Sequence, residues 1–228
     1  MTIRKEIAVD LNTLKGQKEY YKNVCKDIVK IYNKKNDDFT LLQKAISKEN
    51  CYHPYSDYKD ILRESLEEQL PTWFGNNLTI INLGSLTGKW TGHLIPYAKQ
   101  IICVDIVDDG FWYIQERYKH EDCEFKFYLT QGDELENIES NSIDFIFSAD
   151  SLTRTPKNIL QKYFIEFSRV TKRSSLLYIH LSTPDDYKNM IEYSIEEVQN
   201  LCYANDFEFI DFIPSVFTVG SILVARRI

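Results

Sequence analysis

The sequence predicts an α/β fold: a three-layer, doubly wound sheet of seven mostly parallel strands, with a C-terminal antiparallel β-hairpin and an N-terminal helical extension. Two observations predict this fold. From Leu78 onward, short apolar runs rich in β-branched and aromatic residues alternate with stretches of helix length. The last two apolar runs are joined by a loop too short for a parallel crossover. We therefore expect two parts, a helical extension or lid over residues 1–70 and a sheet domain over residues 71–228.

Composition restricts the classes of function. A chain of 228 residues with 43% hydrophobic and 14% aromatic residues is sufficient for one principal domain with a packed core. A net charge of −7 disfavours a nucleic-acid partner, since such binding relies on many Lys and Arg side chains that neutralise phosphates. No signal-like N-terminal segment or bilayer-length apolar run is visible, so we expect a cytoplasmic protein without a membrane span.

The five cysteines predict no special chemistry. They occur singly, without a CxxC pair. A zinc site and a disulfide framework are both poorly supported. We expect no metal, and Cys103, inside an apolar run, is interpreted as a small buried core residue.

The N-terminal 48 residues show a helical apolar stripe and a polar opposite face. The segment Asn50–Tyr58 then reads NCYHPYSDY, which is crowded with aromatic residues around a proline, and a helical pattern resumes at Asp60. The aromatic segment is a candidate lid or substrate edge. Its alternative role is to pin the N-terminal helices to the core.

The sheet elements follow in order. Five runs have the character of parallel strands, with a helix expected over residues 156–171 between the fourth and fifth of them: 78–84, 101–107, 124–130, 142–148 and 175–182. The runs 207–214 and 221–227 are separated by a short loop and should form the antiparallel hairpin.

A glycine-containing loop follows the first predicted strand. In a doubly wound sheet, ligands bind beyond the carboxyl ends of the strands, so this loop is the expected binding loop. Gly84 and Gly88 allow a tight turn and a close approach of the backbone, and a helix beginning near Trp90 offers unpaired amides. Asp105 ends the second strand, where its carboxylate can accept hydrogen bonds from both hydroxyls of a ribose. Each feature alone also occurs in ordinary strand-to-helix turns.

Two nucleotide-binding patterns fit this loop poorly. A phosphate-binding P-loop needs four residues between its first glycine and the Gly-Lys pair, whereas here only three separate Gly84 from Gly88. A dinucleotide loop needs small residues where this loop carries Leu86, Lys89 and Trp90. A nucleoside ligand that carries an amino acid instead of phosphates would need less intimate glycine contact.

On these residues the chain resembles the class I S-adenosyl-L-methionine (AdoMet)-dependent methyltransferases, over Leu78 to Ile228. INLGSLTGKWT resembles the first motif of that family, ICVDI the acid of the second strand, and GDELENIESNSIDFIFSADSL the adenine-contacting acid and the fourth strand. The family also has the terminal antiparallel hairpin. The resemblance implies that residues 71–228 form an AdoMet-binding methyltransferase domain.

The resemblance also implies roles for individual residues. Gly84, Ser85 and Gly88 would line the methionine part of the cofactor, Asp105 would bind the ribose, and Asp133 or Glu134 would approach the adenine amine. The wider set of cofactor-binding candidates adds four flanking positions and one acid after the fourth strand: Asn82, Leu86, Trp90, Ile106 and Asp150. Asn82 replaces the acid that is usual in the family, and Leu86 replaces the middle glycine.

A narrower resemblance concerns the segments GKWT, IDFIFSADSLTRT, YFIEFSRV and YIHLS. They are similar to a bacterial methyltransferase group associated with sugar and polysaccharide decoration, in which a histidine usually occupies the place of Arg154. This resemblance implies O-methylation of a small polar acceptor such as a sugar or a sugar-linked phosphate.

Candidate catalytic residues lie at the same predicted edge of the sheet. Asp150 follows the fourth strand and His180 lies late in the fifth, so both are candidates for a general base. Asp150 could instead cap a helix or hold the methionine amine, and His180 could be a hydrogen-bonded structural histidine. Candidate substrate-binding residues combine aromatic and polar groups suited to a sugar with a donor suited to an anion: Tyr52, His53, Tyr55 and Arg154.

Two other functions compete with methyl transfer. A non-catalytic domain could keep the nucleoside pocket as a regulatory or scaffold site, and the substitutions Asn82, Leu86 and Arg154 favour that reading. A nicotinamide-dependent oxidoreductase is the third hypothesis. The sequence leaves open the identity of the acceptor, the choice between oxygen and nitrogen as the methylated atom, and the oligomeric state.

Overall fold

The computed structural model describes residues 13–34, 77–183, 190–214 and 220–228 of the chain. Its centre is one seven-stranded sheet with the order β3-β2-β1-β4-β5-β7-β6. The strands are β1 Leu78–Leu83, β2 Ala98–Asp105, β3 Glu124–Leu129, β4 Ile143–Ser148, β5 Thr171–Leu181, β6 Phe207–Pro214 and β7 Ser221–Arg227. The first five strands pair in parallel, and β7 pairs antiparallel with both β5 and β6. The predicted fold class, with its terminal hairpin, is confirmed.

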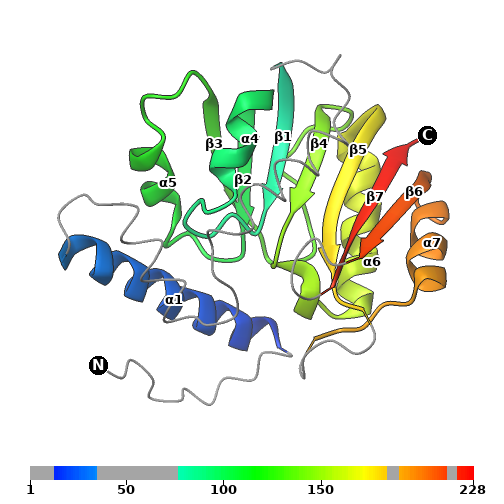
Figure 1. The fold of residues 1–228 in the computed structure, drawn as a ribbon, viewed down its shortest axis with the longest axis horizontal. Helices are drawn as coiled ribbons and strands as arrows, with labels where there is room; N and C mark the ends of the chain where they lie inside the picture. The colour runs from blue at the N-terminus through cyan, green and yellow to red at the C-terminus, as the bar shows by residue number, and fades with distance from the viewer. Residues whose placement is uncertain (1–12, 35–76, 184–189, 215–219) are drawn as a thin grey trace.

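Helices cover both faces of the sheet (Figure 1). Alternate residues of a strand point to opposite faces, so neighbours such as Ile80 and Ile81 belong to different apolar clusters. One face packs against α6 (Lys157–Val170) and α7 (Ile195–Tyr203), and the other against α4 (Thr91–Leu94) and α5 (Phe111–Arg117). Because both faces are covered, the central strands are apolar along most of their length instead of alternating.

The helix α6 illustrates why these residues fold as they do. Its buried side chains recur at helical spacing along one face: Leu160, Tyr163, Phe164, Phe167 and Val170. The opposite face is polar, with Lys157 and Lys162 among its exposed side chains. The packed face holds α6 against the sheet and sets the position of the residues that precede it after β4.

The N-terminal helix α1 (Leu14–Lys34) lies across the side of the sheet at which β1 to β4 end (Figure 1). Gln17 Nε2 donates a hydrogen bond to the backbone oxygen of Arg154 (3.1 Å), and Lys18 Nζ donates one to Gln131 Oε1 (3.0 Å). These contacts tie α1 to the segments that follow β4 and β3. The rest of the predicted extension, residues 35–70, lies outside the described residues, so its boundary stays a prediction.

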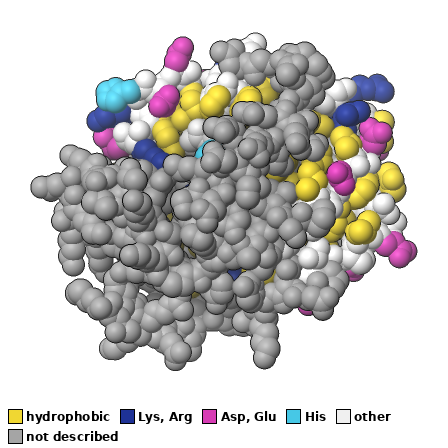
Figure 2. Space-filling view, in the orientation of Figure 1, with side chains coloured by type: hydrophobic (Ala, Val, Ile, Leu, Met, Phe, Trp, Pro, Cys, Tyr) yellow, Lys and Arg dark blue, Asp and Glu magenta, His cyan; other side chains and the backbone are white. Residues whose placement is uncertain are grey.

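Exposed apolar side chains occur on β6, which forms one edge of the sheet, and on the helix α7 beside it. Ile195 and Tyr203 of α7 and Ile210 of β6 are 56%, 60% and 38% exposed. In Figure 2, hydrophobic side chains gather on the right of the molecule, where α7 and β6 lie. None of the three lines the cavity described below. Within the described part of the chain, no helix has the length and apolar character needed to cross a membrane.

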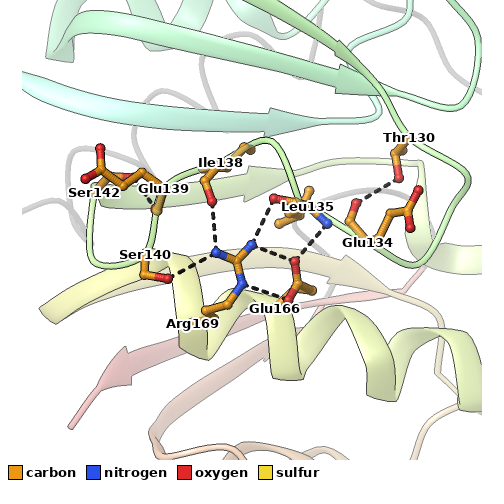
Figure 3. Close-up of polar contacts among 9 residues, drawn as sticks. All are labelled: Thr130, Glu134, Leu135, Ile138, Glu139, Ser140, Ser142, Glu166 and Arg169. Carbon is orange, nitrogen blue, oxygen red and sulfur yellow. Dashed lines mark hydrogen bonds and ion pairs between the residues drawn. The ribbon is translucent and has the colours of Figure 1, made fainter.

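A single ion pair fixes the loop between β3 and β4 (Figure 3). Arg169 of α6 binds Glu166 through two hydrogen bonds of 2.9 and 2.7 Å, and it also donates to the backbone oxygens of Leu135 and Ile138, each at 2.9 Å. Glu166 accepts a hydrogen bond from the backbone N–H of Leu135 (2.9 Å). The pair therefore anchors a segment whose first residues reach the candidate site.

Replacing Arg169 by alanine should lower the free energy of unfolding by about 2 kcal/mol, because hydrogen bonds from a charged donor to two loop carbonyls are lost together with the ion pair. Arg226→Ala is the matched control. Arg226 and Glu208 form an exposed pair at 3.5 Å, with side chains 51% and 55% exposed, so its loss should cost about 0.5 kcal/mol or less. Urea denaturation of both variants measures the difference, and equal effects would contradict this role.

The same pair predicts a pH dependence. The hydrogen bond from Arg169 is the main reason that the pKa of Glu166 is lowered in the folded protein. Its contribution to stability is therefore complete above the pKa of an unfolded glutamate and is lost as the pH falls through the lower folded value. The stability difference between wild type and Arg169→Ala should shrink at acid pH, and a constant difference from pH 7 to pH 3 would contradict this origin.

Candidate functional site

A cavity of about 480 Å³ lies at the carboxyl edge of the sheet. Four neighbouring strand ends supply most of its wall, through residues that include 83–86 after β1, 105–106 after β2, 130–133 after β3 and 149–152 after β4. The helix α1 forms another part of the wall with Leu14, Gln17 and Tyr21. Adjacent strands are about 4.8 Å apart, so the four ends span about 14 Å. An elongated ligand would fit along this edge.

The loop after β1 alternates between left-handed and ordinary backbone conformations. Gly84 and Gly88 have φ angles of 77° and 81°, and Leu86 between them has φ 45°. A side chain on Gly84 would also overlap the Cβ of Ser151. Glycine is therefore required at this position both by the left-handed backbone and by the lack of space. Leu86 bears the strain of a left-handed residue, roughly 1–2 kcal/mol. The turn that the sequence predicts is therefore present, although a leucine occupies one of its three left-handed positions.

Asp105 anchors this loop by accepting a backbone hydrogen bond from it. Its Oδ2 accepts a hydrogen bond from the backbone N–H of Leu86 (2.8 Å), and its Oδ1 accepts one from the N–H of Val107 (3.2 Å). The residue is 5% exposed and lines the cavity. Burial raises the pKa of Asp105 to about 6, although its backbone hydrogen bonds oppose that shift. Because a carboxylate has about four acceptor positions, it can still accept hydrogen bonds from two ligand hydroxyls.

At the β3 end of the cavity, one of the two predicted acids lines the wall. Asp133 does so, and its Oδ2 pairs with Lys162 Nζ of α6 at 2.6 Å. Glu134 does not line the cavity, and its backbone oxygen accepts a hydrogen bond from the hydroxyl of Thr130 (2.8 Å). Of the two alternatives, Asp133 is therefore placed to meet a ligand.

At the β4 end, three ionisable side chains meet. Asp150 has a left-handed φ of 61° and lines the cavity. Its Oδ1 lies 3.1 Å from His180 Nδ1, and its backbone N–H donates a hydrogen bond to the same nitrogen at 3.2 Å. Its Oδ2 lies 3.8 Å from Lys89 Nζ. His180 is completely buried and does not line the cavity, whereas the side chain of Asp150 is 51% exposed.

Several predicted residues lie at the cavity and others support it. Those that line it are Gly84, Ser85, Leu86, Trp90, Asp105, Ile106, Asp133 and Asp150. Asn82 is buried behind the loop, where its Nδ2 donates a hydrogen bond to Thr91 Oγ1 (2.8 Å). Gly88 packs beneath α5 and accepts a hydrogen bond from Tyr118 (2.9 Å). Asn82 and Gly88 thus shape the loop without facing the cavity.

The predicted substrate residues are placed less completely. Arg154 does not line the cavity, but its neighbour Thr155 does. The Nε of Arg154 is buried and has no hydrogen-bond partner. The charge of Arg154 also acts on Tyr21, a cavity residue whose pKa burial raises to about 12. The other three candidates, Tyr52, His53 and Tyr55, lie outside the described residues.

The structure adds cavity residues that sequence reasoning missed. Lys89 is adjacent to Gly88 in the binding loop, so its position was available from the sequence. Gln17 and Tyr21 come from a helix far away in the chain, and only its docking brings them here. Tyr163 belongs to the apolar stripe of α6, where it gave no functional signal.

No group of His, Cys, Asp and Glu side chains suited to a metal ion occurs within the residues that the structure describes. The described polar side chains around the cavity include three carboxylates, one ammonium, two phenols and several amides and hydroxyls. Such a set can bind hydroxyls, an amino group and a carboxylate.

Comparison with known proteins gives three findings. Residues 80–174 match a family model described as a methyltransferase domain. A comparison with curated protein sequences finds no significant match. Many solved structures share the fold.

Three of these solved structures show the extent of the similarity. An AdoMet-dependent methyltransferase from Aquifex aeolicus is 17% identical with a TM-score of 0.55, and the match covers 78% of this chain and 100% of that one. One from Clostridium acetobutylicum is 14% identical with a TM-score of 0.60, covering 79% and 95%. The Haemonchus contortus phosphoethanolamine N-methyltransferase 1, solved with phosphoethanolamine and S-adenosylhomocysteine, is 13% identical with a TM-score of 0.60, covering 92% and 49%.

The chain therefore has the class I AdoMet-dependent methyltransferase fold, and the family match supports a methyltransferase whose cofactor is AdoMet. The residues of the cavity fit that cofactor. Asp105 suits the two ribose hydroxyls, and Gly84, whose backbone packs closely against Ser151, lines the cavity without a side chain. Asp133 lies on the β3 side, while Lys89 and Asp150 lie on the β1 and β4 side. The adenosine part would thus lie toward β2 and β3, and the methionine part toward β1 and β4.

The pKa of Asp105 predicts how cofactor affinity depends on pH. Two ribose hydroxyls can each donate a hydrogen bond to the charged carboxylate. The protonated carboxyl group is a weaker acceptor and carries a proton on one oxygen, so tight binding requires the deprotonated form. Affinity for S-adenosylhomocysteine should be constant above about pH 7 and fall as the pH drops through about 6. Isothermal titration calorimetry between pH 5 and pH 8 measures this dependence.

The variant Asp105→Asn supplies the control. It keeps the shape of the side chain but loses the charge and one acceptor, so affinity should fall at least about tenfold at pH 7.5. The pH dependence around 6 should also disappear. An Asn variant that binds as tightly as wild type, or that keeps the same pH dependence, would contradict the assigned role of Asp105.

Proposed function

We propose that this protein, which has the class I AdoMet-dependent methyltransferase fold, methylates a hydroxyl of a small polar acceptor such as a sugar or a sugar-linked phosphate. The observation that carries the proposal is the position of Asp150. Asp150 lines the cavity after the end of β4, on the side that we assign to the methionine part of the cofactor. Bound AdoMet supplies an activated methyl group, so the protein's task is mainly to align the acceptor and to take its proton.

Asp150 is the proposed general base. Half of its side-chain surface is exposed, so an acceptor can reach the carboxylate. Its left-handed backbone requires support, because a non-glycine residue does not adopt that conformation without cost. The buried His180 provides this support, because its Nδ1 accepts a hydrogen bond from the backbone N–H of Asp150. We therefore assign His180 a positioning role, since it does not line the cavity and cannot touch the acceptor directly.

The acceptor side is proposed from charge and from aromatic residues. Tyr21 and Gln17 of α1 line the cavity, and Arg154 lies next to Tyr21 with a buried Nε that has no hydrogen-bond partner. Although Arg154 does not line the cavity, its positive charge acts on the wall at Tyr21 and favours an acceptor that carries a phosphate or a carboxylate. Tyr52, His53 and Tyr55 stay proposed as sugar-stacking residues of the extension. The polar acceptor also agrees with the overall net charge of −7, which disfavours nucleic acid.

A second function is supported by one observation. Leu86 occupies a left-handed position of the binding loop, and its side chain lines the cavity. An apolar side chain at this point changes the surface that a methionine chain would meet. A domain that binds AdoMet or a related nucleoside without catalysis, as a regulatory or scaffold site, is the alternative.

Radiolabelled methyl transfer distinguishes the two functions. Purified protein, labelled AdoMet and fractionated extracts enriched in sugar phosphates and oligosaccharides should give a labelled product that is stable to peptidase and nuclease. Asp150→Asn should lower the rate at least about a hundredfold, because the proton acceptor is lost, while affinity for S-adenosylhomocysteine changes little.

Asp122→Asn is the matched control, since Asp122 is an exposed acid outside the cavity, and its rate should equal that of wild type. His180→Asn should lower kcat more than it raises KM for the acceptor, as expected of a residue that aligns the base. Tight cofactor binding without transfer to any fraction would favour the scaffold function. An Asp150→Asn variant with the wild-type rate would remove Asp150 from the mechanism.

A further inference from the structure

We propose that Lys89 is the anchor for the carboxylate of the methionine part of AdoMet, and so discriminates ligands with the amino-acid group from nucleosides without it. This inference rests on the proposed function, because it takes AdoMet as the occupant of the cavity. Among the described residues that line the cavity, Lys89 is the one cationic side chain. The other charged side chains in the wall are Asp105, Asp133 and Asp150.

The position of Lys89 along the sheet identifies its partner. It follows Gly88 in the loop after β1, and its Nζ lies 3.8 Å from Asp150 Oδ2, after β4. The strands β1 and β4 are direct neighbours, whereas Asp105 and Asp133 follow β2 and β3. With the ribose at Asp105, the amino-acid end of an extended cofactor must lie toward β1 and β4. The only anion at that end of AdoMet is its carboxylate.

The local environment of Lys89 makes such an ion pair effective. Its side chain is 29% exposed, and Nζ lies 3.7 Å from the centre of the Trp90 ring. Burial lowers the pKa of Lys89 to about 8, and the nearby Asp150 opposes that shift. The contact with Asp150, at 3.8 Å, is longer than a hydrogen bond. A ligand carboxylate at hydrogen-bond distance would form a charge-assisted bond with this ammonium.

The charges of the wall exclude the other ionisable residues as partners of the ligand carboxylate. Asp105, Asp133 and Asp150 carry the same sign of charge as that carboxylate. Lys89 is therefore the cavity residue suited to bind it.

Two ligands isolate the contribution of Lys89. S-Adenosylhomocysteine and 5′-methylthioadenosine share the adenosine and the thioether, but only the first has the amino-acid group. For Lys89→Met, which keeps the length of the side chain and removes its charge, we expect the affinity for S-adenosylhomocysteine to fall about ten- to a hundredfold. The affinity for 5′-methylthioadenosine should stay within about twofold of wild type. Lys89→Arg should retain most of the affinity for both ligands.

Titration calorimetry of both ligands against wild type and the variants is the test, with Lys119→Met as the control for loss of an exposed lysine. Equal losses for the two ligands would show that Lys89 only supports the loop, and no loss for either would place the carboxylate elsewhere; both results overturn the proposal. If wild type binds neither ligand, the identity of the cofactor fails first. Retained binding of 5′-methylthioadenosine also verifies that the variant is folded.

Discussion

The candidate site depends on the hydrogen bond between a buried carboxylate and the loop above it. Asp105 ends β2, and its Oδ2 accepts the N–H of Leu86 from the loop that follows β1. This contact holds two neighbouring strand ends in register and supports the left-handed conformation of Leu86. It also keeps a desolvated carboxylate at the cavity wall, which raises its pKa. The energetic cost of that burial is typical of a binding site, because a ligand with hydroxyl donors can recover part of it.

The order of the strands determines which residues lie on each side of the loop after β1. Since β1 lies between β2 and β4, the loop after β1 meets an acid on each side, Asp105 and Asp150. In the proposed site, the first acid would lie on the adenosine side and the second on the side of the reaction. The buried His180 on β5 contacts Asp150 and supports its position. One loop thus lies between the group proposed to bind the cofactor and the group proposed to take the proton.

Much of this could be predicted from the sequence, because the relevant signals are local. The strand runs, the short terminal hairpin, the glycines of the loop and the acid that ends β2 can each be recognised from a few consecutive residues. The roles of Asn82 and Gly88 were harder to predict, since packing against Thr91 and α5 turns both away from the cavity. The sequence left His180 as a candidate base, because no local pattern shows that it is buried. Its burial depends on β7 and on Gly220, which follow 40 residues later in the chain. The cavity wall formed by α1 depends on long-range docking that no local pattern encodes.

A crystal structure of the protein with S-adenosylhomocysteine tests the central claim most directly. The account predicts the ligand along the ends of β3, β2, β1 and β4, with both ribose hydroxyls within hydrogen-bond distance of the Asp105 carboxylate and the thioether beside the loop 84–88. A ligand bound elsewhere, or a ribose that makes no contact with Asp105 while the carboxylate keeps only its bonds to Leu86 and Val107, would contradict it.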